Sequence, residues 1–285
     1  MYMRSSTRNR QFGASLMELM VGITIGLLVV LAAIGSLIYT RVSSTTMVDA
    51  TRLQQKADTA FRIINFQTLQ AGAIELTPSI DPSTVVFSTA YTGFRPDAPS
   101  MPASVIVSAN GMDGNGTTTQ DVLRVSYQDN GTVLNCLSQS TVNSAIRVDN
   151  VFTYVPTAGG GGNITCSESV AGAIPQPILD GVEDFQVTYG IRTVNAGVEG
   201  YQFLTATQIN GLAPIADDAT LSSGAVNPWI RVNTINICLQ LRGDSRGNPR
   251  PGFAAIQTCG AVADSNDGFL RRVYRRTFSL RNTLL

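Results

Sequence analysis

The first candidate for chemistry is an acid near the start of the chain, at the edge of a long apolar run. Glu18 is the only charged residue between Arg10 and Arg41. A carboxylate beside a membrane-spanning segment costs on the order of 2–3 kcal/mol, so its presence requires a reason. The chemistry that it can supply is ion pairing with a cation in a low-dielectric environment, where opposite charges attract strongly.

A processing point is expected at Gly13, directly before the apolar run. The residues in front of it include three arginines and no acid, and basic residues that flank an apolar helix keep that flank in the cytoplasm. A secretory signal peptide is cleaved at small residues after its apolar stretch, but the residues directly after Tyr39, which are Thr40, Arg41, Val42 and two serines, contain no A-x-A pattern. Cleavage after Gly13 would instead remove the basic leader and leave the helix on the mature protein.

Four cysteines, all beyond the apolar run, are candidates for disulfide bonds: Cys136, Cys166, Cys238 and Cys259. Their even number, wide spacing and exported context favour disulfides over a metal site, with free buried thiols as the alternative. Three pairings are possible. We prefer Cys136–Cys166 and Cys238–Cys259, because each closes a loop rich in Gly, Asn, Pro or Ser. Closing such a loop stabilises a protein by roughly 3 kcal/mol.

The composition argues against an enzyme. The chain has 285 residues, 20 basic and 20 acidic, and no histidine, which excludes His-based triads, His-ligated zinc and the commonest general base. The oxygen side chains from Asp113 to Asp121 do not complete an EF-hand loop, because Thr118 and Arg124 stand where such a loop needs Gly and Glu. A net charge of zero gives no general attraction to nucleic acid. We therefore expect a non-enzymatic protein without a cofactor or a metal.

The apolar run and the residues after it predict one long helix, from about Ser15 to Ala71. Residues 14–40 are expected to be a transmembrane helix, since roughly 20 apolar residues cross a bilayer. Residues 41–72 are expected to form an amphipathic half that lies on a globular domain and ends at Gly72. Its apolar residues recur at three- and four-residue steps: Leu53, Ala57, Ala60, Phe61 and Ile64.

Two glycines inside the apolar segment are candidates for close helix packing. Gly22 and Gly26 form a G-x-x-x-G pattern, a spacing that lets helices approach closely in lipid. The pattern is common, so an incidental pair of glycines is the alternative.

Beyond residue 72 the chain has short runs in which apolar and polar residues alternate. These runs lie at 123–127, 185–191, 235–241 and 274–280 and are typical of half-buried strands in an antiparallel sheet. Loops are expected at 110–119, 159–162, 210–227 and 243–252. The expected fold class is α+β: a long N-terminal helix packed on an antiparallel sheet with long loops, residues 73–285 forming a β-rich head.

The segment from Gly13 to Glu18, followed by the apolar helix, resembles the class III signal of type IV pilins and pseudopilins. The resemblance implies the type IV pilin fold, removal of residues 1–13 by a prepilin peptidase, and N-methylation of Ala14. It also implies that Glu18, the fifth mature residue, pairs with the N-terminal amine of a neighbouring subunit. Ala14 departs from the usual Phe or Met. A plain membrane anchor with an incidental glutamate is the alternative.

Three further segments resemble PilW-type minor pilins: 54–72, 178–189 and 271–282. The J-type pseudopilin of type II secretion shares this layout. Either resemblance implies a low-abundance subunit that primes filament assembly with other minor pilins and the major pilin. It implies a single-pass protein of the bacterial inner membrane with its head in the periplasm, which later enters the filament or its tip.

Two other classes of function are compatible with the sequence. A subunit at the filament tip could bind a surface or DNA, and a cluster of arginines near the C-terminus could face such a ligand or an acidic partner: Arg271, Arg272, Arg275, Arg276 and Arg281. A solvated strand face is the simpler interpretation of that cluster. An anchored periplasmic enzyme is disfavoured, because no nucleophile and base can be assembled from the sequence.

Overall fold

The structure is a computed structural model that describes residues 15–73, 109–114, 120–129, 133–139, 146–158, 160–168, 174–195, 198–212, 228–246, 258–260 and 267–281. Its elements are α1 (Leu16–Gln70), β1 (Ala109–Met112), β2 (Val122–Asp129), β3 (Ile146–Pro156), β4 (Gly162–Glu168), β5 (Gln176–Asn195), β6 (Val198–Leu204), α2 (Ala206–Asn210), the 3-10 helix η3 (Pro228–Arg231), β7 (Val232–Arg246) and β8 (Phe269–Ser279). The chain divides into two compact units, Met1–Val48 and Asp49–Leu285.

The first unit contains the apolar part of α1. Among the described residues, α1 is the one helix long and apolar enough to cross a membrane, with a mean hydropathy of 2.6 in its most apolar window. The helix ends where the sequence predicted. Gly72 has a φ of 72°, a left-handed conformation that favours glycine after a helix, and its N–H donates to the carbonyl of Ser126 at 2.8 Å.

In the second unit, α1 packs on the sheet through one face. The buried apolar side chains of this face are Leu53, Ala57, Ala60, Phe61 and Ile64, the same residues whose spacing predicted an amphipathic helix. The ring of Phe61 lies 6.0 Å from that of Phe278 in β8. The expected α+β arrangement, a long N-terminal helix packed on an antiparallel sheet, is confirmed.

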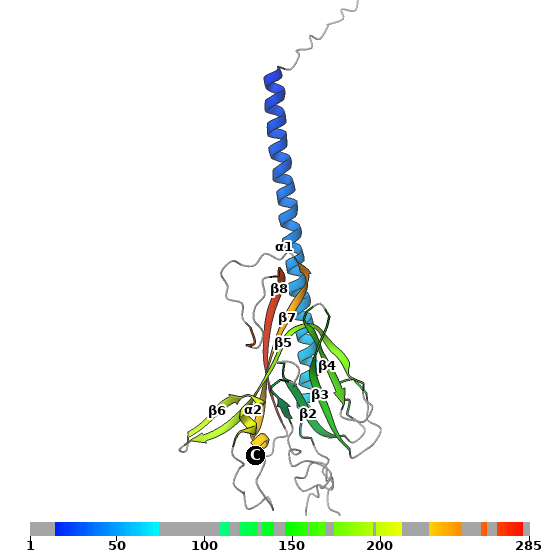
Figure 1. Ribbon diagram of the computed structural model, residues 1–285, viewed down its shortest axis with the longest axis vertical. Helices are drawn as coiled ribbons and strands as arrows, with labels where there is room; N and C mark the ends of the chain where they lie inside the picture. Colours follow the sequence, from blue (N-terminus) through cyan, green and yellow to red (C-terminus); the bar gives the residue numbers. More distant parts are fainter. Residues whose placement is uncertain are drawn as a thin grey trace, which may run out of the picture. The chain divides into compact units, whose positions relative to one another are not determined.

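All strand pairs in the described part of the head are antiparallel. The strand order is β1-β2-β3-β4-β5-β7-β8, with β6 beside β5. The 20-residue strand β5 joins the two parts of this sheet. Its first half pairs with β4 and its second half with β6, while β7 pairs along its other edge. Figure 1 shows β6 and α2 set apart from β2, β3 and β4.

The alternation expected for the strands is found in the core. On β7, the apolar residues Ile235, Ile237, Leu239 and Leu241 are fully buried, as period-two burial requires of a strand with one face on the core. Position 111 requires glycine, because a Cβ on Gly111 would collide with the hydroxyl of Tyr189.

Several expected loop boundaries are wrong. Residues 110–112 lie in β1, residue 162 begins β4, residue 210 ends α2, and residues 243–246 belong to β7. Glycine and asparagine suggested turns at the three places that lie in strands, but pairing with a neighbouring strand overrides a weak local preference. The extension of β7 depends on a register shift between Arg242 and Arg246, which lets Arg246 pair with Phe269.

Candidate functional site

The first candidate site is the start of α1. Gly13 and Ala14 lie outside the described residues, and Glu18 lies in the first turn of the helix. The backbone N–H groups of Glu18 and Leu19 both donate to the carbonyl of Ser15, at 2.9 and 3.1 Å. A carboxylate in the first turn is stabilised by the helix dipole, whose N-terminal end is positive. The structure therefore places the lone acid where a helix favours it.

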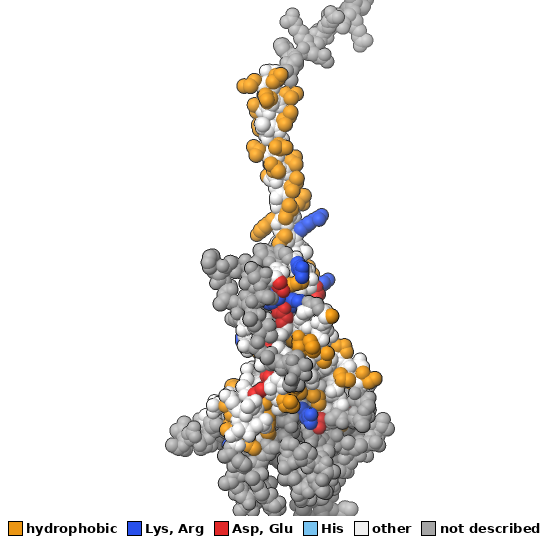
Figure 2. All heavy atoms as spheres, in the orientation of Figure 1, with side chains coloured by type: hydrophobic (Ala, Val, Ile, Leu, Met, Phe, Trp, Pro, Cys, Tyr) orange, Lys and Arg blue, Asp and Glu red, His pale blue; other side chains and the backbone are white. Residues whose placement is uncertain are grey.

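The apolar part of α1 exposes a surface whose contact with water is unfavourable. From Leu16 to Tyr39 its large apolar side chains are 49–76% exposed, and Figure 2 shows them along the visible face of the helix. The hydroxyl of Thr24 donates to the carbonyl of Val21 at 2.9 Å, so this polar group is satisfied within the helix. Contiguous apolar surface of this extent marks a contact with lipid or with other apolar helices.

No described residue packs closely against the glycine pair in this segment. A Cβ on Gly22 or Gly26 would meet nothing within 4 Å. Close packing of other helices at these positions stays a prediction.

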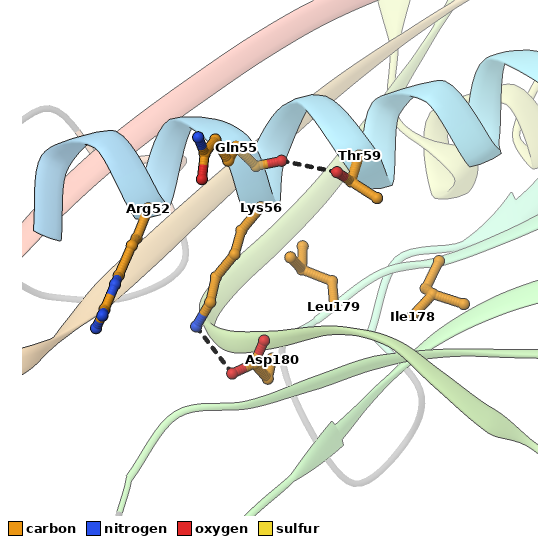
Figure 3. A pocket seen from close by; sticks show the side chains of 7 residues that line it. All are labelled: Arg52, Gln55, Lys56, Thr59, Ile178, Leu179 and Asp180. Carbon is orange, nitrogen blue, oxygen red and sulfur yellow. Dashed lines mark hydrogen bonds and ion pairs between the residues drawn. The ribbon is translucent and has the colours of Figure 1, made fainter. Parts of the chain in front are cut away.

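The second candidate site lies in the head, where the three segments that resemble PilW come together. Lys56 of α1 contacts Asp180 of β5, with Nζ and Oδ2 2.8 Å apart. Figure 3 shows this pair in a shallow pocket between α1 and β5. The side chains that line the pocket are Arg52, Gln55, Lys56, Thr59, Ile178, Leu179 and Asp180.

Three residues further along β5, Glu183 meets the third segment. Arg271 of β8 donates through Nε to Oε2 of Glu183 at 2.6 Å and through a terminal nitrogen to Oε1 at 2.9 Å. Both side chains are buried, with exposed fractions of 4% for Arg271 and 9% for Glu183. Gln240 of β7 also donates to Glu183, at 3.2 Å. Glu183 is thus held by hydrogen bonds from two strands.

Arg271 also holds a second carboxylate. Its two terminal nitrogens donate to Asp267 at 2.6 and 2.7 Å. These hydrogen bonds lower the pKa of Asp267 well below its ordinary value, and bonding to Asp267 and Glu183 raises the pKa of Arg271 although burial opposes this. A buried guanidinium shared by two carboxylates fixes where β8 lies on the sheet.

The arginines of β8 do not form a single basic face. Arg271 is buried against acids, Arg275 donates to the carbonyl of Thr258 at 2.9 Å, and Arg276 contacts Asp58 at 3.2 Å on the side of α1. Successive side chains of a strand point to opposite faces of the sheet, so adjacent arginines in β8 are separated.

The acids considered for a metal loop bind backbone groups instead. Asp113 accepts from the N–H groups of Ala206 and Thr207, both at 2.8 Å, at the start of α2. Asp121 accepts from Val187 at 2.7 Å and from Gly114 at 3.2 Å. Within the described residues, no three His, Cys, Asp or Glu side chains gather as a metal site would require.

Burial raises the pKa of Asp121 to about 6, and the nearby acids Asp113 and Asp184 add to this, although the two backbone N–H donors oppose it. Asp121 lies beside β5 between the segments that pair with β4 and β6. Its backbone N–H donates to the carbonyl of Phe185 at 3.0 Å. The carboxylate therefore replaces strand pairing along part of the edge of β5.

Two disulfides are present, in the pairings preferred from the sequence. Cys136 pairs with Cys166 and Cys238 with Cys259, with Cα–Cα distances of 6.3 and 5.7 Å. Beside the first bridge, Asn150 donates to Gln67 of α1 at 2.8 Å and accepts from the backbone N–H of Cys136 at 3.2 Å. This buried network ties the end of α1 to the first disulfide.

Sequence reasoning missed the partners of Glu183 and Asp121. The signal for Glu183 was present, since a carboxylate inside an alternating apolar strand requires a buried cation. The sequence does not say which arginine supplies it.

Residues 156–282 match the family model of PilW, described as type IV pilus-assembly protein W. No curated protein sequence matches the chain. A solved structure similar to it is the type IV-like pilin TTHA1219 from Thermus thermophilus, with a TM-score of 0.39 and 13% identity, covering 81% of this chain and 98% of that chain.

The apolar helix followed by an antiparallel head defines an α+β, type IV pilin-like class of protein. Within that class, the segment that contains both Glu183 and Arg271 is the one that matches PilW. The predicted resemblance to PilW-type minor pilins is thereby confirmed.

Proposed function

We propose that this protein is a minor pilin that primes a type IV pilus and becomes part of it. The observation that carries the proposal is Glu18, a lone carboxylate on an exposed apolar helix, in a chain whose C-terminal part matches PilW. A carboxylate among apolar helices is stable only when paired. The N-terminal amine of a neighbouring subunit, made by cleavage after Gly13, would supply that pair.

In this proposal the parts of the chain have separate roles. Residues 1–13 are a leader removed by prepilin peptidase, and Ala14 is the methylated N-terminus. Residues 14–40 hold the protein in the inner membrane and later lie in the filament, with Gly22 and Gly26 at helix contacts. Residues 41–72 carry the head, 73–285, in the periplasm. The role is structural, so we propose no catalytic residue and no cofactor.

The proposal is tested by N-terminal sequencing of the mature protein from a membrane fraction. We expect the sequence to begin at Ala14 and to depend on a prepilin peptidase in the same cells. A chain that keeps residues 1–13, or one that begins beyond Tyr39, would contradict the proposal. A pseudopilin of type II secretion would give the same N-terminus, and it would be distinguished by co-purification with secretion components rather than with the major pilin.

A second candidate function is a binding surface displayed at the tip. One observation favours it: Tyr201 and Phe203 of β6 are 68% and 49% exposed, and both lie on one face of a strand set apart from β2–β4 (Figure 1). Aromatic side chains of this kind are common anchors in interfaces. Replacing both by Ala should leave the number of filaments unchanged while adhesion or DNA uptake falls, if tip binding is the function.

A further inference from the structure

Among the described strands, β8 ends the sheet and pairs along one edge only, with β7. β8 pairs with β7 from Thr234–Ser279 to Arg242–Arg271 without a register shift, and the N–H of Leu280 donates to the carbonyl of Asn233 at 2.8 Å. Along a strand of an antiparallel pair, the backbone N–H and C=O groups of one residue bond the partner strand and those of the next residue point away from it. The even-numbered residues of β8 therefore bond β7, and the odd-numbered residues direct their N–H and C=O groups outward.

Four of these outward residues are available for pairing: Val273, Arg275, Thr277 and Ser279. In the part of the chain that the structure describes, their backbone groups make no hydrogen bond outside the β7 ladder. All four are half-buried or exposed, and β8 contains no proline. An edge of this kind is a template for a further strand.

A groove runs beside this edge between α1 and β8. It is lined by Asp58, Phe61, Arg62, Asn65, Arg276, Thr277 and Phe278. An added strand would lie next to this groove and could place side chains into it, because alternate residues of a strand point to the same face.

The charges around the edge select the partner. Arg62, Arg272, Arg275 and Arg276 are exposed there, and Asp58, which contacts Arg276, is the one acid lining the described groove. Opposite charges directly across two strands stabilise their pairing, and like charges destabilise it. Two copies of this chain joined through β8 would bring arginines together, so a second copy is a poor occupant.

We propose that the free edge of β8 is a docking edge for an acidic β-strand of another subunit. The added strand would bond the odd-numbered residues of β8 and place carboxylates opposite Arg272, Arg275 and Arg276. That this strand comes from a neighbouring pilus subunit rests on the proposed function. The preference of the edge for an acidic strand does not depend on the proposed function.

The probe is a fluorescent nine-residue peptide of alternating Thr and Val with three Glu, and the matched control carries Lys at the same places. Binding to the full chain in detergent micelles is measured by fluorescence anisotropy. We expect the Glu peptide to bind at least about tenfold more tightly than the Lys peptide, because three cross-strand pairs change sign. Equal binding of the two peptides, or no binding of the Glu peptide, would overturn the proposal.

Two variants at one position test the backbone edge. Thr277→Pro removes an outward N–H without removing a backbone bond to β7, and it also removes the hydroxyl of Thr277, which donates to Asn236 at 3.4 Å. Thr277→Ala removes that hydroxyl as well but keeps the N–H, so it is the matched control. We expect the Pro variant to bind the Glu peptide at least about tenfold more weakly and the Ala variant to bind as the unaltered chain does. Equal binding by both variants would contradict strand addition.

The charge preference gives a test that does not depend on proline. If Thr277→Pro fails to fold, as judged by circular dichroism, Arg272→Glu decides the question. It should weaken binding of the Glu peptide and strengthen binding of the Lys peptide, and an unchanged preference would overturn the proposal. Peptide binding needs neither cleavage after Gly13 nor Glu18, so its failure would leave the proposed function to its own test.

Discussion

Glu183 in β5 and Arg271 in β8 form a two-point ion pair, at 2.6 and 2.9 Å, although β7 lies between their strands. The two side chains meet on the face of the sheet opposite α1, above Gln240 of β7, which also donates to Glu183. A guanidinium fork matches a carboxylate in two places at once. The pair therefore fixes three strands relative to one another.

Removing Arg271 should destabilise the head strongly. Arg271→Ala leaves the buried Glu183 without its main partner, and we expect the free energy of unfolding to fall by about 3 kcal/mol. Urea unfolding of the full chain in micelles, followed by the fluorescence of the buried Trp229, measures this. Arg271→Lys keeps the charge but loses the fork, so it should recover less than half of the loss. An unchanged midpoint in the Ala variant would contradict this account.

Removing Lys56 should have a small effect by comparison. Its partner Asp180 is 65% exposed and Lys56 itself 24% exposed, and exposed ion pairs contribute about 0–1 kcal/mol. We expect Lys56→Met to change the free energy of unfolding by less than about 0.5 kcal/mol in the same urea experiment. A loss as large as that of Arg271→Ala would mean that the pocket of Figure 3 contributes more than its exposure indicates.

Asp121 should make stability depend on pH. Burial raises its pKa in the folded protein from 3.8 to about 6, so between about pH 4 and pH 6 the folded state binds more protons than the unfolded state. The free energy of unfolding therefore falls as pH rises through this window, by at most about 3 kcal/mol. Thermal unfolding at pH 5 and pH 7.5 measures the difference.

The control for this prediction is Asp121→Asn, which cannot titrate. We expect it to be less stable than the unaltered protein at pH 5, because one amide oxygen replaces two acceptors, and to lose the pH dependence between pH 5 and pH 7.5. Asp267 does not interfere, since its lowered pKa means that its contribution is lost only below about pH 4. If the free energy of unfolding depended on pH equally in both proteins, a titratable group other than Asp121 would be responsible.

Each disulfide should stabilise the folded head. The bridges span 30 and 21 residues, and loops of these sizes correspond to about 3 kcal/mol each. We expect Cys136→Ala with Cys166→Ala to cost more than the other pair of changes, because the first bridge closes the longer loop and holds in place the backbone N–H that donates to the buried Asn150. Urea midpoints of the two double variants measure this, and a larger loss for Cys238→Ala with Cys259→Ala would refute it.

Glu18 should matter for assembly and not for membrane insertion. Glu18→Ala removes the one acid of the apolar segment, which favours insertion, but it leaves no partner for the amine of a neighbouring subunit. We expect normal amounts of processed protein in the membrane and at least a tenfold loss from sheared filaments, both measured by immunoblotting. Thr24→Val is the matched control, because the hydroxyl of Thr24 is satisfied within its own helix. Filament levels equal to the control would argue against the pairing role.

Sequence reasoning succeeded where the signal is local and periodic. The apolar stripe from Leu53 to Ile64 predicted the buried face of α1, and alternation at 235–241 predicted the buried face of β7. It was less successful at the ends of strands, where Gly243 suggested a loop that is in fact a continuation of β7. Turn preferences are weak, and pairing with a neighbour decides them.

The sequence alone determined the long helix, the isolated acid, the antiparallel character of the head and the resemblance to PilW, because each depends on residues close together in the chain. The tertiary structure was needed to show that Glu183 meets Arg271 and that Asp121 replaces strand pairing along part of β5. These relationships join residues far apart in sequence. A hydrophobic pattern specifies which face of a strand is buried, but the order and register of the strands determine which charges lie side by side.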